Sequence, residues 1–177
     1  SFYKASNVSF TIKPFESNNL EQILINAPGS KSECNRVLLM AALGKGDCLI
    51  KNCLISEDTL YMINALKELG IKIEFLPSSD NNEQASVDIL ISGSNSFKNS
   101  DKIDTGMLYL GNSGTCVRFL TPFLCSSIIN KSITITGNNH MRKRPIKPLV
   151  DCLLKNGANI LPMNINNPDC PPINIQS

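Results

Sequence analysis

Runs of apolar residues, separated by short polar and glycine-rich segments, predict an alternation of strands and helices along the chain. The run over residues 37–43 is apolar nearly all round, so we expect a helix from about Ser32 to Leu43 that is buried on every side. A second helix is predicted after Ser56, because Ser56 can cap it, apolar residues follow at helical spacing and Gly70 ends it. Two more helices are predicted over residues 119–125 and 144–154.

Prolines restrict the later helices. Pro145 and Pro148 fit only the first turn of the last helix, and Pro122 either belongs to the first turns of the third helix or kinks it. Strands are predicted where apolar residues alternate with polar ones or form short runs. The predicted strands cover residues 8–12, 23–25, 47–52, 71–75, 87–91, 107–110, 132–136, 160–163 and 173–175.

The order of these elements occurs twice. Each half reads as strand, glycine-rich turn, apolar helix, strand, amphipathic helix, strand and strand, and Gly29 precedes Arg36 by the same spacing as Gly111 precedes Arg118. A duplication of this kind predicts that the two apolar helices begin at the same end of the molecule. The predicted organisation is an N-terminal strand and linker over 1–22, a first βαβαββ unit over 23–93, a linker over 94–104 and a second, equivalent unit over 105–177.

The apolar character of the two repeated helices selects among fold classes. Helices that cover a doubly wound sheet present one face to solvent, whereas these two are too apolar to do so. The sequence therefore predicts an α/β (α+β) fold, built of repeated βαβαββ units, in which roughly parallel helices are buried and short sheets lie outside.

The start of the first repeated helix carries the clearest binding chemistry. The first backbone N–H groups of a helix lack intrahelical partners and stand at the positive end of the macrodipole, so they attract anions. Lys31, Ser32 and Arg36 add side-chain donors at this start, and Arg118 occupies the equivalent place in the second unit. The pattern predicts a paired anion site, although a helix that merely begins with basic residues remains an alternative.

Carboxylates and cysteines offer other candidate chemistry. Glu57 and Asp58 follow Ser56, and we favour a role in stabilising the start of that helix over a catalytic role, because acidic residues complement the macrodipole there. The seven cysteines form no C-x-x-C pair, and a single His cannot complete a Cys/His zinc set, so no metal is expected. Four of them are predicted to be reduced, buried side chains because they fall in apolar patterns, namely Cys34, Cys116, Cys125 and Cys152.

Composition narrows the possible partners. The chain has 177 residues, of which 42% are hydrophobic, enough for one domain with a real core. A net charge of +2 and the absence of Trp argue against nucleic-acid binding. No apolar run approaches the roughly 20 residues that a membrane helix needs. Because the N-terminal residues also lack the layout of a signal peptide, we expect a cytoplasmic protein.

Several motifs together resemble the EPSP synthase family, most closely the version fused within arom-type multifunctional polypeptides. The resemblance runs in order from about residue 20 to the end of the chain. It rests on Pro28-Gly29-Ser30-Lys31-Ser32-x-x-Asn35-Arg36, Ser56-Glu57-Asp58-Thr59, Leu110-Gly111-Asn112-Ser113-Gly114-Thr115 and Arg144-Pro145-Ile146. The fold that the resemblance implies is an inside-out αβ barrel of two domains, each with three such repeats around buried parallel helices. This chain would supply two repeats of one domain.

The resemblance also implies an activity. The family transfers the enolpyruvyl group of phosphoenolpyruvate to the 5-hydroxyl of shikimate 3-phosphate, a step toward chorismate and the aromatic amino acids. It implies no metal or organic cofactor, and it implies glyphosate as an inhibitor. The general acid and base, together with the remaining synthase domain, are expected outside this chain, so the isolated chain would be inactive or nearly so.

Roles for individual residues follow from the motif positions. Lys31 would contact both substrates and is the one possible catalytic residue, while Ser32 and Arg36 would bind shikimate 3-phosphate. Gly114, where a Cβ would intrude on the ligand, is the position at which replacement gives glyphosate resistance in the family. The remaining substrate contacts implied by the resemblance are Asn112, Thr115, Arg118 and Arg144.

One position departs from the family pattern. His140 stands where the family has an Arg that grips phosphoenolpyruvate, and an imidazole offers no guanidinium fork. His140 could bind more weakly, Arg142 could replace it from a shifted loop, phosphoenolpyruvate binding could be poor, or His140 could be an exposed residue without a role. Two other functions stay open: a phosphate-binding module without catalysis, and a relative of UDP-N-acetylglucosamine enolpyruvyl transferase, against which the Ser-Lys-Ser-x-x-Asn-Arg wording argues.

Overall fold

The computed structural model describes residues 11, 29–76, 86–93, 106–127 and 131–176. The predicted strands over 8–12 and 23–25 and the turn between the third and fourth strands of the first unit lie outside these residues, apart from residue 11. The described elements of the first half are α1 (Lys31–Leu43), β1 (Gly46–Leu54), α2 (Glu57–Glu68), β2 (Lys72–Leu76) and β3 (Ser86–Gly93). Those of the second half are β4 (Met107–Tyr109), α3 (Gly114–Ser127), β5 (Ser132–Thr136), η2 (Met141–Lys143), α4 (Lys147–Lys155), β6 (Asn159–Pro162) and β7 (Ile173–Gln176).

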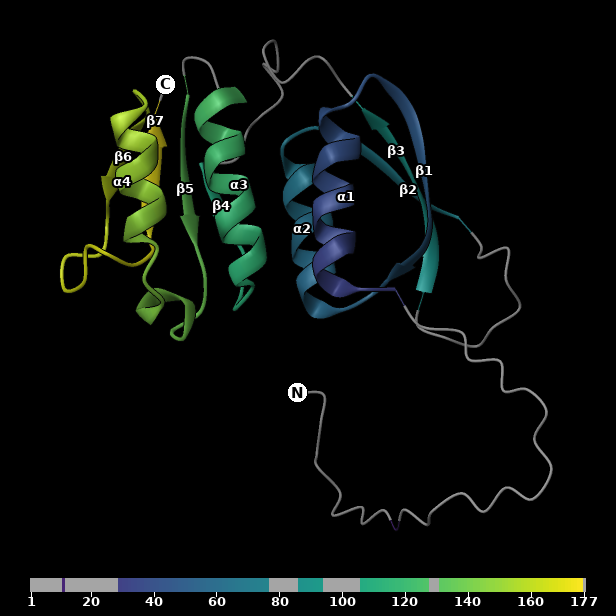
Figure 1. Ribbon diagram of the computed structural model, residues 1–177, viewed down its shortest axis with the longest axis horizontal. Helices are drawn as coiled ribbons and strands as arrows, with labels where there is room; N and C mark the ends of the chain where they lie inside the picture. The colour runs from purple at the N-terminus through teal and green to yellow at the C-terminus, as the bar shows by residue number, and fades with distance from the viewer. Residues whose placement is uncertain (1–10, 12–28, 77–85, 94–105, 128–130, 177) are drawn as a thin grey trace.

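Two sheets flank a central group of helices. The first sheet has the strand order β1-β3-β2 and is antiparallel, and the second has the order β4-β5-β7-β6, with β4 parallel to β5 and the other pairs antiparallel. Figure 1 shows α1, α2 and α3 running side by side between the two sheets. This arrangement confirms the predicted α/β class, with roughly parallel helices inside and short sheets outside.

The core forms where these helices meet. Leu38 of α1, Met62 and Leu66 of α2, and Leu120 and Leu124 of α3 are all 0% exposed. Each such side chain contributes roughly 1.5–3 kcal/mol by leaving water. Burial along the facing sides of three parallel helices therefore fixes their relative positions, and with them the positions of their first turns.

The first turns of the three helices lie at the same end of the molecule, the lower end in Figure 1. Side-chain caps define where each helix begins. Ser30 Oγ accepts from the Glu33 N–H of α1 at 3.5 Å, and Ser113 Oγ accepts from the Cys116 N–H of α3 at 3.4 Å. Ser56 and Thr59 form a reciprocal capping box on α2, which confirms the predicted cap.

The turn that leads into α1 packs tightly against the first sheet. A Cβ on Gly29 would stand 2.6 Å from the Asn52 carbonyl oxygen, so only glycine fits between this turn and β1. Asn52 has a φ of 54°, and its N–H donates to Asp88 Oδ1 of β3 at 3.0 Å. These contacts fix the first residue of α1 relative to the sheet.

The prediction that α1 is buried on every side is wrong. Its face toward α2, α3 and the sheet is buried, but Val37, Met40 and Leu43 are 41%, 69% and 49% exposed. Apolar residues on every side of a helix favour burial of the whole helix. Each face is buried, however, only where another helix or strand packs against it. In the described part of the chain no element covers this face of α1.

Two helices begin at places that differ from those predicted. α3 starts at Gly114, so Pro122 lies in its interior rather than in its first turns. α4 starts at Lys147, so Pro148 is in its first turn but Pro145 precedes the helix, after the short 3-10 helix η2. The strands are otherwise close to those predicted, except that β1 continues through Leu54 and β3 through Gly93.

The cysteines are all free thiols. Cys34 and Cys116 are buried and Cys125 is half-buried, but Cys152 is exposed, contrary to the prediction. The reason is that α4 lies on the outside of the helical group and buries only a narrow stripe around Val150. Among the described residues, no helix is both long and apolar enough to cross a membrane.

Candidate functional site

A cavity of about 530 Å³ lies where the helix starts converge. Its walls come from the first turns of α1, α2 and α3 and from the segment that precedes α4. The lining residues are Lys31, Ser32, Arg36, Glu57, Asp58, Asn112, Gly114, Thr115, Arg118, Phe119 and Arg144. The starts of α1 and α3, which are far apart in the sequence, therefore meet at one site, because the two helices are parallel and begin at the same end of the molecule.

The α1 wall supplies an ammonium group and free backbone donors. Lys31 is the first residue of α1, and its Nζ lies 3.0 Å from Asp58 Oδ2 at the start of α2. The side chain of Lys31 is 48% exposed and that of Asp58 is 21% exposed, so the pair stands at the mouth of the cavity rather than within the core. An ion pair this exposed is weak, about 0–1 kcal/mol, and an anionic ligand can compete for the ammonium group.

The wall opposite α1, called the α3 wall, combines the start of α3 with the segment before α4, and each supplies one guanidinium group that is held by backbone carbonyls. Arg118 donates from Nη1 to the Gly114 carbonyl at 3.1 Å and from Nη2 to the Pro145 carbonyl at 3.3 Å. Arg144 donates from Nη1 to the Asn112 carbonyl at 3.0 Å. These bonds join the start of α3 to the segment before α4 and orient both guanidinium groups at the cavity wall.

Gly114 is the point over which both guanidinium groups lie. A Cβ on Gly114 would stand 2.7 Å from Arg118 Nη1 and 3.2 Å from Arg144 Nη1. The first distance requires a shift of the Arg118 side chain. A glycine here therefore lets two arginines approach the first backbone N–H groups of α3, and the site concentrates positive charge at that helix start.

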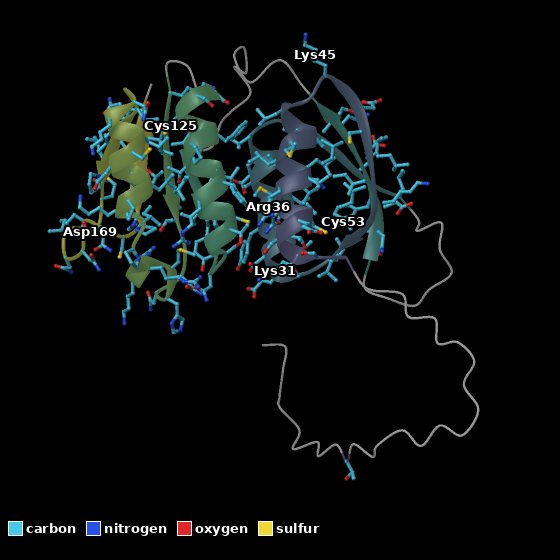
Figure 2. All side chains as sticks on the ribbon, in the orientation of Figure 1. Lys31, Arg36, Lys45, Cys53, Cys125 and Asp169 are labelled. Carbon is cyan, nitrogen blue, oxygen red and sulfur yellow. The ribbon has the colours of Figure 1, made fainter. Side chains whose placement is uncertain are left out.

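Arg36 is held differently from the other cations. Its guanidinium carbon lies 5.8 Å from the centre of the Phe119 ring, so α1 and α3 also meet through a cation–π contact. Figure 2 shows Arg36 on the side of α1 that faces α3, with Lys31 at the lower end of the same helix.

A hydrogen-bonded chain behind the cavity links the starts of α2 and α3. Cys116 Sγ donates to the Asp58 carbonyl at 3.3 Å, and Ser113 Oγ donates to Cys116 Sγ at 3.0 Å. Burial raises the pKa of Cys116 to about 11, so the thiol stays protonated near neutral pH and can donate. The thiol is a structural contact in this arrangement, not a nucleophile.

The charge balance of the cavity favours anions. Four cationic side chains, Lys31, Arg36, Arg118 and Arg144, face two carboxylates, Glu57 and Asp58. Three helix starts add partial positive charge to this excess. In the described part of the chain no group of three or more His, Cys, Asp or Glu side chains could hold a metal ion. The chemistry that the cavity can supply is therefore recognition of phosphate and carboxylate groups.

Most of the residues singled out from the sequence meet in this cavity. His140 and Arg142 stand elsewhere. His140 is exposed and precedes η2, and its backbone N–H donates to Asn138 Oδ1 at 3.0 Å. Arg142 lines a separate hollow and donates from Nε to the Gly137 carbonyl at 3.1 Å. The lining residues brought together from the predictions are Lys31, Ser32, Arg36, Asn112, Gly114, Thr115, Arg118 and Arg144.

Sequence reasoning missed two features of the site. Asp58, interpreted as a helix-stabilising charge, also pairs with Lys31 at the cavity, and the place of Asp58 within the motif Ser56-Glu57-Asp58-Thr59 was the available signal. Phe119 was interpreted only as part of an apolar helix, and nothing in the sequence indicated its contact with Arg36.

Comparisons with known proteins show which proteins this chain is similar to. The family model of EPSP synthase (3-phosphoshikimate 1-carboxyvinyltransferase) matches residues 16–177. The pentafunctional AROM polypeptide of Komagataella phaffii is 41% identical over 159 residues, a match that covers 86% of this chain and 9% of that polypeptide. The corresponding polypeptide of Saccharomyces cerevisiae is 43% identical over 148 residues, covering 81% of this chain and 9% of its own length.

Solved structures give the same result. EPSP synthase from Acinetobacter baumannii aligns with a TM-score of 0.71 at 26% identity, over 86% of this chain and 31% of that chain. The chain thus spans only a small part of the curated relatives and less than half of the solved enzyme.

Proposed function

The chain belongs to the EPSP synthase family, and from that premise we propose that its cavity binds shikimate 3-phosphate and phosphoenolpyruvate. In the whole enzyme the cavity would form one half of the site in which the enolpyruvyl group passes from phosphoenolpyruvate to the 5-hydroxyl of shikimate 3-phosphate. The observation that carries the proposal is the convergence of Lys31, Arg36, Arg118 and Arg144 on three helix starts. The two substrates bring two phosphates and two carboxylates, whose mutual repulsion these groups would offset.

The proposed roles follow the two walls of the cavity. Ser32 and Arg36 on α1 bind shikimate 3-phosphate, and Lys31, which stands between the walls, contacts both substrates. At the start of α3, Asn112 in the preceding turn and Gly114 and Thr115 in the first turn border phosphoenolpyruvate. Arg118 and Arg144 add positive charge to that wall from the two carbonyl anchors described above.

Lys31 has the most direct connection to the reaction. When a ligand phosphate replaces Asp58 as its partner, the ammonium group can stabilise negative charge as the hydroxyl attacks and as phosphate leaves the tetrahedral intermediate. Of the two carboxylates in the cavity, Asp58 is engaged by Lys31 and Glu57 accepts from the Tyr61 hydroxyl at 3.1 Å. We place the general acid and base in the domain that is not part of this chain.

We also propose that the chain is two βαβαββ units, residues 23–93 and 105–177, of one domain. Such a chain would bind substrate but would not turn it over, because the proposed general acid and base belong to another domain. Glyphosate would compete for the α3 wall beside Gly114. His140 stands outside the cavity lining, so phosphoenolpyruvate would bind through Lys31 and the arginines of the α3 wall.

A titration of the chain with shikimate 3-phosphate, followed by calorimetry, tests the proposal. We expect saturable binding at one site, weakened roughly tenfold or more by Arg36→Ala, since a charge-assisted hydrogen bond contributes about 1.5–3 kcal/mol. Lys45→Ala is the matched control, because Lys45 is exposed at the opposite end of α1 (Figure 2) and should leave the affinity unchanged. Equal affinity in all three proteins would overturn the site.

The same titration distinguishes the second candidate function. A phosphate-binding module without catalysis would bind inorganic phosphate as tightly as shikimate 3-phosphate, because it would have no contacts for the ring. Its only support is that three helix starts and four cationic side chains line the cavity within this chain.

A further inference from the structure

The cations of the cavity differ in how many of their donors are already used. Lys31 is paired with Asp58, Arg118 donates to two carbonyls and Arg144 donates to the Asn112 carbonyl. Arg36, by contrast, makes no hydrogen bond or ion pair with another described residue, and its contact is with the ring of Phe119. Arg36 is therefore the described cavity arginine whose guanidinium keeps all its N–H groups for a ligand.

A contact with an aromatic face restrains a guanidinium without using its donors. The attraction acts between the cation and the negative face of the ring, whereas the N–H groups point outward in the guanidinium plane. An acidic partner at the same place would hold Arg36 more firmly, but it would compete with an incoming phosphate for the same N–H groups. Phe119 therefore orients the Arg36 guanidinium without occupying its N–H groups. Asp58, by contrast, pairs with Lys31 and competes with an anionic ligand for the ammonium group.

The ring of Phe119 is itself well fixed. Phe119 is half-buried, packs against the core and lines the cavity, so one side of the ring is anchored while another faces Arg36. It stands on α3, whereas Arg36 stands on α1, so the contact also joins the two walls of the cavity. Because α3 is held to the other helices by fully buried residues such as Leu120, the backbone of Phe119 cannot shift relative to α1 without disturbing the core.

We propose that Phe119 is a positioning residue, which holds the Arg36 guanidinium over its ring so that the free N–H edge is presented to an oxyanion of the bound ligand. This inference rests on the proposed function, because it names how one of the proposed contacts is oriented. It predicts a preference for ligands whose oxyanion can accept two parallel N–H bonds, as a phosphate monoester can.

The first test compares Phe119→Leu with Phe119→Tyr by calorimetric titration with shikimate 3-phosphate. Leucine keeps an apolar side chain of similar reach but has no ring face, and we expect roughly two- to fivefold weaker binding, the effect of losing an exposed cation–π contact. Tyrosine keeps the ring face, and we expect an affinity within about twofold of the unaltered protein. Thermal unfolding of each variant reports whether the core has changed.

A double-mutant cycle separates positioning from packing. If Phe119 acts through Arg36, Phe119→Leu has no further effect on affinity in the Arg36→Ala background. An equal loss in both backgrounds, or an unchanged affinity in Phe119→Leu while Arg36→Ala binds weakly, overturns this inference and leaves the proposed function standing. Unchanged binding in Arg36→Ala would instead overturn the proposed function.

Discussion

Lys31 Nζ lies 3.0 Å from Asp58 Oδ2, so the lysine proposed to contact both substrates is paired with a carboxylate in the free protein. The pair joins the first turns of α1 and α2, and the carbonyl of the same aspartate accepts from Cys116 at the start of α3. Asp58 is therefore the residue at which all three helix starts meet. An anionic ligand that binds Lys31 must displace this carboxylate or bind beside it.

Asp58→Asn should strengthen phosphate binding. The substitution removes a negative charge from the cavity but leaves the backbone carbonyl that accepts from Cys116. A unit charge about 4 Å away contributes about 1 kcal/mol even at the dielectric of water, so affinity for inorganic phosphate should rise several-fold. Asp47→Asn, an exposed site at the start of β1, is the control and should have no effect. Weaker binding in the Asp58 variant would show that its charge orients Lys31 rather than competing with the ligand.

Gly114→Ala should weaken ligand binding without unfolding the protein. The new Cβ would stand 2.7 Å from Arg118 Nη1, so the guanidinium must leave its position. Loss of one charge-assisted hydrogen bond predicts about ten- to hundredfold weaker binding of phosphoenolpyruvate in a titration. Gly106→Ala is a matched control, because nothing lies within 4 Å of the Cβ that it would add. Equal affinities in the two variants would contradict the role given to the Arg118 guanidinium.

Ser56→Ala should lower the free energy of unfolding by about 1 kcal/mol, the usual contribution of such a cap. Ser56 Oγ accepts from the Thr59 N–H at 3.3 Å at the start of α2, directly before the two cavity carboxylates. Urea denaturation measures the loss, and Ser56→Asn, which keeps a capping oxygen, should recover most of it. If alanine and asparagine are equally stable, the cap does not hold this helix start.

Stability should fall at alkaline pH through Cys53. Burial first, and then the neighbouring Cys34 thiol, raise the pKa of Cys53 from 9.0 to about 12. The pKa of Cys53 is higher in the folded protein than in the unfolded chain. The contribution of the protonated thiol to the free energy of unfolding is therefore fully present below pH 9.0 and is lost as the pH rises toward about 12. Urea denaturation at increasing pH should therefore show a steeper loss in the unaltered protein than in Cys53→Ala. Parallel curves would contradict the burial of a protonated thiol at this position.

Helix starts and strands could be predicted from the sequence because their signals are local. Ser56 caps the helix that it was expected to cap, and Gly70 follows that helix with a φ of 90°. The common level of the first turns of α1 and α3 could also be predicted, because a duplicated unit places equivalent helices alike. Because the two helices begin side by side, Lys31, Arg36 and Arg118 line the same cavity.

The features that could not be predicted depend on contacts between elements. The exposure of Met40 depends on which neighbours α1 has, and no local pattern contains that information. Pro122 was expected either in the first turns of its helix or at a kink, and the sequence did not decide between them; the structure places this proline in the interior of α3. Predicting the ion pair between Asp58 and Lys31 would require the relative placement of α1 and α2. In the sequence, an acidic residue in a first turn has the same pattern whether it faces a cavity or solvent.

The central claim is that ligand phosphate binds at the converging starts of α1 and α3. Amide NMR spectra of the isotopically labelled protein, recorded as shikimate 3-phosphate is added, test this claim most directly. We expect the largest shifts at the first N–H groups of both helices, over residues 31–33 and 114–116, while the amide of Lys45 stays unchanged. Shifts confined to other regions, such as the hollow beside Arg142, or no shifts at saturating ligand, would contradict it.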